Sequence, residues 1–162
     1  MTDLMLMPKM TARTILDALR QRHRPRWNGD TPNWVLFEEL SGHPSFNPRR
    51  IDLWAMNCWE SKREMVAYEV KVSRSDFLHE MKQPQKRRYA LMYSNKFFFA
   101  TPIGLIRHEE LPPEAGLVEV DAEGKCHEKV PALWRDCYPP SWNFVASLGR
   151  RMNANMKEAQ GD

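Results

Sequence analysis

Two apolar runs separated by a polar stretch constrain the fold of this chain more than any other feature of its sequence. The runs occupy residues 50–56 and 65–72, and residues 57–64 between them are largely polar. Short apolar runs bounded by polar residues are typical of β-strands, and two in succession predict an antiparallel hairpin with a longer loop. We therefore expect a β-sheet at the centre of the fold.

Helices are predicted before this hairpin. Residues 11–22 carry apolar side chains at helical spacing, which predicts a short amphipathic helix. Thr31 can cap a helix and Pro32 fits a first helical position, so a second helix is expected from there to about Ser41, ended by Gly42.

The segment after the hairpin predicts two further helices. Ser73 and Asp76 form a pattern like a capping box, which predicts a helix over residues 74–81. Pro84 disfavours helix at the residue before it, so a break is expected there, followed by a new helix over residues 84–93.

The remainder of the chain adds strands and a final helix. Residues 96–101 are a short apolar strand, and residues 117–120 and 126–130 flank a turn and predict a hairpin. Residues 140–159 read as an amphipathic helix. This order of elements predicts the α/β class, with a mixed sheet and helices on both faces. All 162 residues are expected to form one domain, with a core over about residues 31–130 and the terminal helices as additions.

Composition excludes several classes of protein. No apolar segment approaches the ~18 residues of a membrane span, and the start of the chain is too short and too acidic for a signal peptide. Cys58, Cys126 and Cys137 form no disulfide or zinc pattern, and their odd number favours reduced thiols. We therefore expect a cytoplasmic protein with no membrane partner.

Basic residues are concentrated in two parts of the sequence although the net charge is only +3. Residues 11–26 hold five arginines and one aspartate, and residues 82–96 hold no acid. Such stretches are typical of a surface that contacts phosphates. The alternative, that they are ordinary solvated faces, stays open.

One group of charged residues on the central hairpin can carry chemistry. Side chains alternate along a strand, so Glu69 and Lys71 share one face, and Asp52 on the preceding strand can lie beside either of them. Two partly buried carboxylates repel each other unless a cation neutralises them. Hard oxygen ligands suit Mg²⁺ or Mn²⁺, and the lysine can orient or help deprotonate an attacking water.

Asp52 and the sequence Glu69-Val70-Lys71 together resemble the PD-(D/E)XK nuclease superfamily, which has the restriction-endonuclease-like fold. The resemblance covers about residues 39–117 and extends to small nuclease-like proteins encoded by phages, prophages and bacteria. The core of that family, a helix, a three-stranded meander, a helix and a strand, is similar to the order of elements predicted above. Arg50-Ile51 stands where the family often has a proline before the aspartate.

The resemblance implies a role for each residue of the site. It makes Asp52 and Glu69 the ligands of Mg²⁺, for which Mn²⁺ can substitute, and Lys71 the catalytic lysine. The family often adds a glutamate from the helix before the first strand. Glu38 and Glu39 both stand there, and we favour Glu39 as a further catalytic residue and metal ligand.

The resemblance also implies a surface that binds DNA. Exonuclease-type members carry Gln-x-x-x-Tyr on the helix after the lysine strand, and residues 85–89 fit this pattern, which would put the two side chains on one helical face. The residues expected to contact DNA are Arg74, Lys82, Gln85, Lys86, Arg87, Arg88 and Tyr89.

The expected function is that of a metal-dependent DNA nuclease, a hydrolase of phosphodiester bonds in phage or bacterial DNA processing, repair or recombination. Three alternatives stay open. The chain can be a catalytically silent module of the nuclease fold that binds DNA or a phage or host replication or repair protein. Glu69 and Lys71 can be a plain surface ion pair. The chain can also be a structural or inhibitory phage protein that recognises a host enzyme. Whether it forms a homodimer depends on the DNA substrate and on endonucleolytic or exonucleolytic cleavage, both of which stay open.

Overall fold

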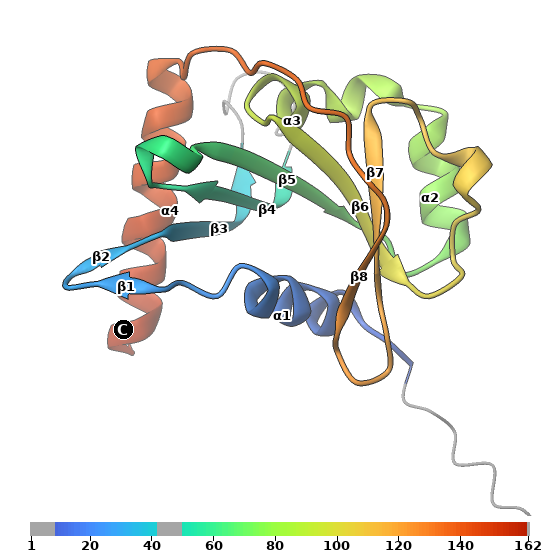
Figure 1. The fold of residues 1–162 in the computed structure, drawn as a ribbon, viewed down its shortest axis with the longest axis horizontal. Coiled ribbons are helices and arrows are strands. Elements are labelled where there is room, and N and C mark those ends of the chain that lie inside the picture. The colour runs from blue at the N-terminus through green and yellow to red at the C-terminus, as the bar shows by residue number, and fades with distance from the viewer. Residues whose placement is uncertain (1–8, 42–49, 162) are drawn as a thin grey trace, which may run out of the picture.

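The computed structural model describes residues 9–41 and 50–161, and a six-stranded mixed sheet forms its centre (Figure 1). The strands lie side by side in the order in which they follow one another in the chain. They are β3 (Trp34–Ser41), β4 (Arg50–Asn57), β5 (Glu64–Val70), β6 (Lys96–Pro102), β7 (Ala115–Val120) and β8 (Cys126–Val130). The β5–β6 and β6–β7 pairs are parallel, and the other neighbours are antiparallel.

Helices cover both faces of this sheet. On one face, α1 (Ala12–Arg22) buries Ile15 and Leu19 against a cluster that includes Tyr68 and Phe98. The other face carries α2 (Arg74–Met81), α3 (Arg88–Met92) and α4 (Trp142–Gln160). Phe77 of α2 and Phe144 of α4 pack there with Trp54 and Phe99. The core is therefore two apolar layers divided by the sheet, which confirms the α/β class with a mixed sheet flanked by helices.

Smaller elements complete the fold. The two-residue strands β1 (Trp27–Asn28) and β2 (Thr31–Pro32) pair with each other. Three short 3₁₀ helices are η1 (Glu60–Lys62), η2 (Pro84–Arg87) and η3 (His108–Glu110). From β8 an extended segment runs along the top of the view in Figure 1 to α4, and its Arg135 and Tyr138 amides donate to the Asn95 and Met92 carbonyls.

Most of the predicted elements are confirmed. The central hairpin is β4 and β5, the later hairpin is β7 and β8, and α1 and α4 lie where terminal helices were expected. The Ser73 hydroxyl accepts the Asp76 amide at the start of α2, as its capping pattern predicts. The helix expected over residues 84–93 is present only as η2 followed by the short α3.

The helix predicted between Thr31 and Ser41 is wrong, because this segment forms β2 and β3. Gly29, with a φ of 59°, turns the chain between β1 and β2, so Thr31 and Pro32 are strand residues and no helix cap. The residues from Trp34 onward then pair along the length of β4. This pairing outweighs the helix-start signal of Thr31 and Pro32, because it gives the backbone groups along the free edge of β4 their hydrogen-bond partners. Gly42 lies outside the described residues.

None of the helices in the described part of the chain is long and apolar enough to cross a membrane.

His23, just after α1, is a buried titratable group whose contacts tie α1 to the sheet. Its Nε2 lies 2.6 Å from the Tyr68 hydroxyl, and its ring packs against Trp34. Burial, with the nearby charges of Arg22 and Lys96, lowers the pKa of His23 to about 4. The folded protein therefore holds this imidazole neutral in a pH range where the unfolded chain protonates it.

We expect His23 to destabilise the fold in acid. Its stabilising neutral form is fully present above the ordinary pKa of 6.5 and is lost as the pH falls through about 4. The shift corresponds to roughly 2–3 kcal/mol of unfolding free energy across this interval. Chemical denaturation of wild type and of the His23→Gln variant at a series of pH values measures it. The loss between pH 6.5 and pH 4 should be smaller by this amount in His23→Gln. A matched variant at the exposed His79 should behave as wild type, and equal losses in all three proteins would refute the prediction.

Candidate functional site

The candidate site lies where the pairing of β4 with β5 ends. Backbone pairs extend from Asn57 and Glu64 to Leu53 and Tyr68. Two residues past Tyr68, the Val70 amide donates to Oδ2 of Asp52 at 2.8 Å, so a side-chain carboxylate replaces a backbone carbonyl as the acceptor. This bond fixes the Asp52 carboxylate between the two strands, next to Glu69.

Lys71 follows β5 and forms an ion-pair network with two glutamates. Its Nζ lies 2.8 Å from Oε1 of Glu69 and 3.3 Å from Oε2 of Glu80. The Lys71 amide donates to the Ala100 carbonyl, which continues the parallel pairing with β6 and holds the residue in place. Side chains alternate here, so Glu69 and Lys71 lie on the face that α2 covers, opposite the Tyr68 ring. The structure thus brings together Asp52, Glu69 and Lys71, which the sequence identified as a group.

Glu80 is a member of this cluster that the sequence analysis missed. It lies in the last turn of α2 with only 5% of its surface exposed. The signal is its position three residues after Phe77, the aromatic residue that anchors α2 to the core, because residues at i and i+3 share one face of a helix. An acid on the buried face of a helix needs a partner, and Lys71 is that partner.

Charge and burial together shift the pKa values of Asp52, Glu69 and Lys71. Burial raises the pKa of Glu69 to about 7, assisted by the Asp52 charge and opposed by Lys71. Burial also raises the pKa of Asp52, against the Val70 amide and the Lys71 ammonium. Burial lowers the pKa of Lys71, but Glu69 and Glu80 outweigh it, so the net direction is upward and the ammonium stays charged. Glu69 and Glu80 both contact the one lysine, and Asp52 adds a further acid whose pKa that lysine lowers without pairing with it, so the site holds more acids than cations.

The sequence predicts a helix at Glu39, but this residue lies in strand β3. Continuing the register of β3 and β4, it lies opposite Asp52, and its charge adds to the upward shift of the Asp52 pKa. Among the described residues it is the one non-glycine residue with positive φ, 49°, a strained conformation that recurs at functional sites. Its carboxylate is half exposed and pairs with Arg50. The alternative, Glu38, points to the other face, where it pairs with Arg13 and Arg20 of α1.

The donor set fits a hydrated divalent cation and does not fit an ion enclosed by protein ligands alone. Nowhere in residues 9–41 and 50–161 do three or more His, Cys, Asp or Glu side chains lie close enough together to form a complete metal site. Asp52 and Glu69 supply two hard carboxylates, and of the Asp52 oxygens only Oδ2 has a hydrogen-bond donor within the described chain. Mg²⁺ is commonly held by one or two carboxylates, with water and substrate phosphates completing its shell.

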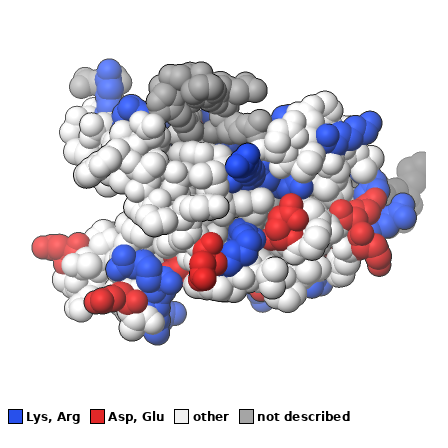
Figure 2. Space-filling view, turned by 90° about the horizontal axis from the view of Figure 1, so that it is seen from above, with Lys and Arg blue, Asp and Glu red and all other residues white. Residues whose placement is uncertain are grey.

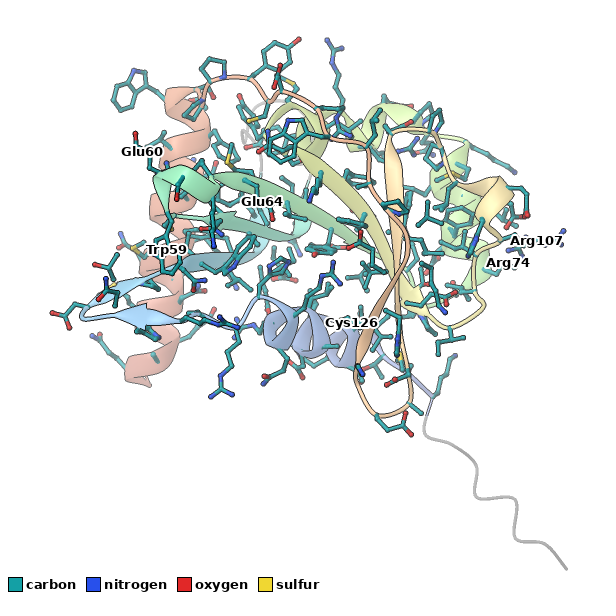
Figure 3. All side chains as sticks on the ribbon, viewed as in Figure 1. Trp59, Glu60, Glu64, Arg74, Arg107 and Cys126 are labelled. Atoms are coloured by element: carbon teal, nitrogen blue, oxygen red, sulfur yellow. The ribbon has the colours of Figure 1, made fainter. Side chains whose placement is uncertain are left out.

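Two of the residues expected to contact DNA are held by internal ion pairs. The Arg74 guanidinium forms a fork with Glu110 and also donates to the Leu105 carbonyl, and Figure 3 shows it beside Arg107 at the edge of the molecule. Arg87 is buried, pairs with Glu114 and lies 5.9 Å from the centre of the Phe99 ring. The prediction for Arg87 is corrected, because a buried guanidinium cannot reach a DNA backbone.

The remaining predicted contacts fall into two groups. Tyr89 packs against Tyr93 and Phe144, so it joins α3 to α4, whereas Gln85 precedes α3 in η2 and points to solvent. The expected shared helical face of Gln85 and Tyr89 is thus replaced by two separate positions. The predicted contacts that are exposed are Lys82, Gln85, Lys86 and Arg88.

The charges on the surface are mixed. On the face shown in Figure 2, basic and acidic side chains lie interspersed, with wide uncharged areas between them. A groove of about 460 Å³ runs between Gln85 and Arg88 on one side and Arg135 and Tyr138 on the other. Its lining also includes the acidic Asp136, and the Arg135 guanidinium donates to the Glu114 and Ser94 carbonyls.

Comparison with known proteins gives the fold and no activity. No protein-family model and no curated protein matches the chain. Among solved structures, the chain is similar to the SPO1766 protein of unknown function from Silicibacter pomeroyi, with 21% identity and a TM-score of 0.56 over 79% of this chain and 78% of that one. At this identity the likeness shows a shared fold alone.

The raised pKa of Glu69 predicts that this residue destabilises the folded protein at alkaline pH. Its folded pKa of about 7 exceeds the ordinary 4.5, so stability is lost as the pH rises from 4.5 through 7. The Glu69→Gln variant should exceed wild type by roughly 2 kcal/mol in unfolding free energy at pH 8 and by little at pH 4.5. Denaturant titrations at both pH values measure the difference. Glu64→Gln, at the start of the same strand, is the matched control and should show no such gain. A Glu69→Gln variant no more stable than wild type at pH 8 would contradict this prediction.

Proposed function

We propose that this protein is a metal-dependent nuclease that hydrolyses phosphodiester bonds in DNA. The observation that carries the proposal is that Asp52, Glu69 and Lys71 lie together where the pairing of β4 with β5 stops, tied by the Val70–Asp52 and Lys71–Glu69 hydrogen bonds. The finding that residues 34–41 form β3 supports it, since α1 now precedes the three-stranded meander β3–β4–β5, followed by α2 and β6. This is the order of the core to which the sequence shows a resemblance.

The site residues would have two kinds of role: some would bind the metal ion, and Lys71 would orient the attacking water and stabilise negative charge. Asp52 and Glu69 would hold Mg²⁺, which supplies Lewis-acid stabilisation of the charge that develops on a phosphate. Lys71, kept protonated by Glu69 and Glu80, donates hydrogen bonds. It is therefore suited to orienting the attacking water and stabilising negative charge, and less suited to removing a proton. Glu39, at the rim, would be an additional ligand or would orient water through its exposed carboxylate.

DNA would lie over the end of α2 and the start of α3. The exposed Lys82, Lys86 and Arg88 lie there and would contact phosphates, and the groove beside Arg88 would add Tyr138. Contacts of this kind give affinity without reading base sequence and weaken as salt rises. Arg74 would shape the site by fixing the first turn of α2 to the loop after β6.

A second candidate function is a silent module that binds DNA without cutting it. One observation favours it. The Lys71 ammonium already bridges Glu69 and Glu80, so the ion-pair network around it is complete in the protein alone. Dependence on a divalent cation separates the two functions, because a silent module would bind DNA equally well in the presence of a chelator.

Nuclease activity in Mg²⁺ or Mn²⁺ is the direct test of the leading proposal. On a panel of linear, nicked, branched and single-stranded DNA and of RNA, the purified chain should cleave at least one DNA substrate. Asp52→Asn and Lys71→Ala should each lower the rate by about 100-fold or more, since each removes charge stabilisation from the transition state. Lys125→Ala, an exposed lysine in the β7–β8 turn, is the matched control and should retain the wild-type rate.

Thermal unfolding gives this test a readout besides activity. Mg²⁺ or Mn²⁺ should raise the melting temperature of wild type and of Lys71→Ala, and should leave Asp52→Asn unchanged, because a ligand stabilises only the state that binds it. Cleavage by Asp52→Asn at the wild-type rate would rule out the mechanism. Equal metal-induced shifts in wild type and Asp52→Asn would place the ion elsewhere.

DNA binding should depend on the exposed basic residues and not on the buried one. Lys86→Ala and Arg88→Ala should each weaken binding to DNA of any sequence and reduce the slope of log affinity against log salt by about 1. Arg87→Ala should instead lower the melting temperature and leave the salt slope unchanged, since its partner is Glu114. Fluorescence anisotropy across a salt series measures these slopes. An Arg87→Ala slope reduced as much as that of Arg88→Ala would overturn the assignment.

A further inference from the structure

Helix α4 carries a row of exposed apolar side chains between Trp142 and Met156, although it already has a buried face. Phe144 and Ser147 are its buried residues and pack toward the sheet. On another side of the helix, Trp142 is 88% exposed, and Val145, Met152 and Met156 are 41%, 52% and 55% exposed. These four residues, with Gly149 between them, form what we call the outer stripe. Monomeric proteins expose single apolar residues routinely, but a continuous row marks an interaction surface.

The outer stripe has the spacing of a helix-packing seam. Its members follow one another at steps of three, four, three and four residues, the pattern that keeps one row of side chains against a neighbouring helix. The inner face of α4 packs on β3. Nothing in the described chain packs over the outer stripe. The second apolar face is thus free for a partner.

Gly149 lies at the centre of the outer stripe, and the fold of one chain does not require it. A Cβ at this position would meet nothing within 4 Å. A glycine within a helix is less favourable than alanine. What it provides is a gap in the row of side chains, which allows another backbone to approach closely.

The spacing about Gly149 makes the outer stripe self-complementary. Trp142 and Met156 lie equally far from it, seven residues before and after, and Val145 and Met152 lie four before and three after. A two-fold axis through Gly149 would therefore set Trp142 against Met156 of the partner subunit, and would set Val145 within one residue of Met152 of the partner subunit. Such matching of a surface with itself is what a symmetric dimer requires. It also forms a contact between sulfur and an aromatic ring at each end.

The borders of the outer stripe favour a second copy over a charged partner. Ala146 and Asn153 lie on one side and Leu148 and Asn155 on the other, so no charge would face its own copy across the axis. An acidic or basic partner would find no complementary charge along this seam. We propose that the outer stripe of α4 is the interface of a symmetric homodimer in which two α4 helices pack antiparallel about Gly149. This inference does not depend on the proposed nuclease activity.

The expected dimer is reversible. A single pair of helices about 22 Å long in the stripe buries less than the roughly 800 Å² per partner of a standard stable interface. Sedimentation velocity of the full chain over a micromolar to submillimolar range should therefore show a concentration-dependent exchange between monomer and dimer. Monomer alone across this range would overturn the proposal.

A charge-exchange series tests which surfaces meet. Val145→Lys and Met152→Glu each place an unpaired charge in the seam and should raise the dissociation constant by about tenfold or more. The double variant places each introduced lysine beside the introduced glutamate of the other copy and should restore dimerisation. Asn143→Lys, exposed on α4 but off the stripe, is the matched control. Circular dichroism verifies that each variant is folded.

Two results would overturn the proposal even if a dimer forms. Unchanged dissociation constants in both single variants would place the interface elsewhere. Binding of the wild-type monomer to anionic phospholipid vesicles, lost in Met152→Glu without any dimer being detected, would assign the stripe to a lipid surface. Gly149→Cys adds a direct geometric readout, because residues on a two-fold axis lie next to each other. Under mild oxidation it should form a cross-linked dimer faster than wild type, whose Cys58, Cys126 and Cys137 are partly buried. An equal rate would contradict packing about Gly149.

Discussion

The hydrogen bond from the Val70 amide to the Asp52 carboxylate determines how the rest of the site is arranged. It lies where the pairing of β4 with β5 stops, two residues before the end of β5, and it gives the Val70 amide a carboxylate oxygen as its acceptor in place of a backbone carbonyl. Glu69 then has the Asp52 charge near it, and the Lys71 ammonium pairs with Glu69 and lowers the pKa of both acids. A strand pair that continued through this point would keep Asp52 and Glu69 as ordinary residues on a sheet surface.

Much of this arrangement follows from the alternation of residues along the two strands. The runs around Asp52 and Glu69 specify a hairpin, and a period of two puts Glu69 and Lys71 on one face. The segment from Thr31 to Ser41 forms strands and not the predicted helix, because its start signal is local, whereas the pairing of its main strand is with residues distant in sequence. Glu80, Arg74 and Arg87 were misjudged or missed for a related reason. Whether a charged side chain meets solvent or a partner depends on packing between elements, which a pattern within one element does not contain.

The cluster of Asp52, Glu69 and Lys71 lowers the stability of the folded protein, which indicates that it is kept for a function. Glu69 and Asp52 have raised pKa values because burial and mutual repulsion oppose their charged forms, and Lys71 compensates only in part. A protein selected for stability alone would place neutral or apolar residues here, because replacing buried ionic groups with packed apolar ones is often neutral or stabilising. A positive φ at Glu39, opposite Asp52, adds strain at the same point. Perturbed carboxylates and strained backbone at one opening of a sheet are typical of sites that hold a charged ligand.

Glu80 explains how Lys71 can serve such a site without being neutralised by it. If Glu69 were its sole partner, any ligand that drew the Glu69 carboxylate away would leave a partly buried ammonium alone, which is costly. Glu80 is held by α2, a separate element that is anchored in the core by Phe77, so its contact with Lys71 does not depend on the position of Glu69. The ammonium therefore keeps a carboxylate partner and retains donors for a water or a phosphate oxygen. The placement of α2 against β5 is thus as much a part of the site as the two strands that carry Asp52 and Glu69.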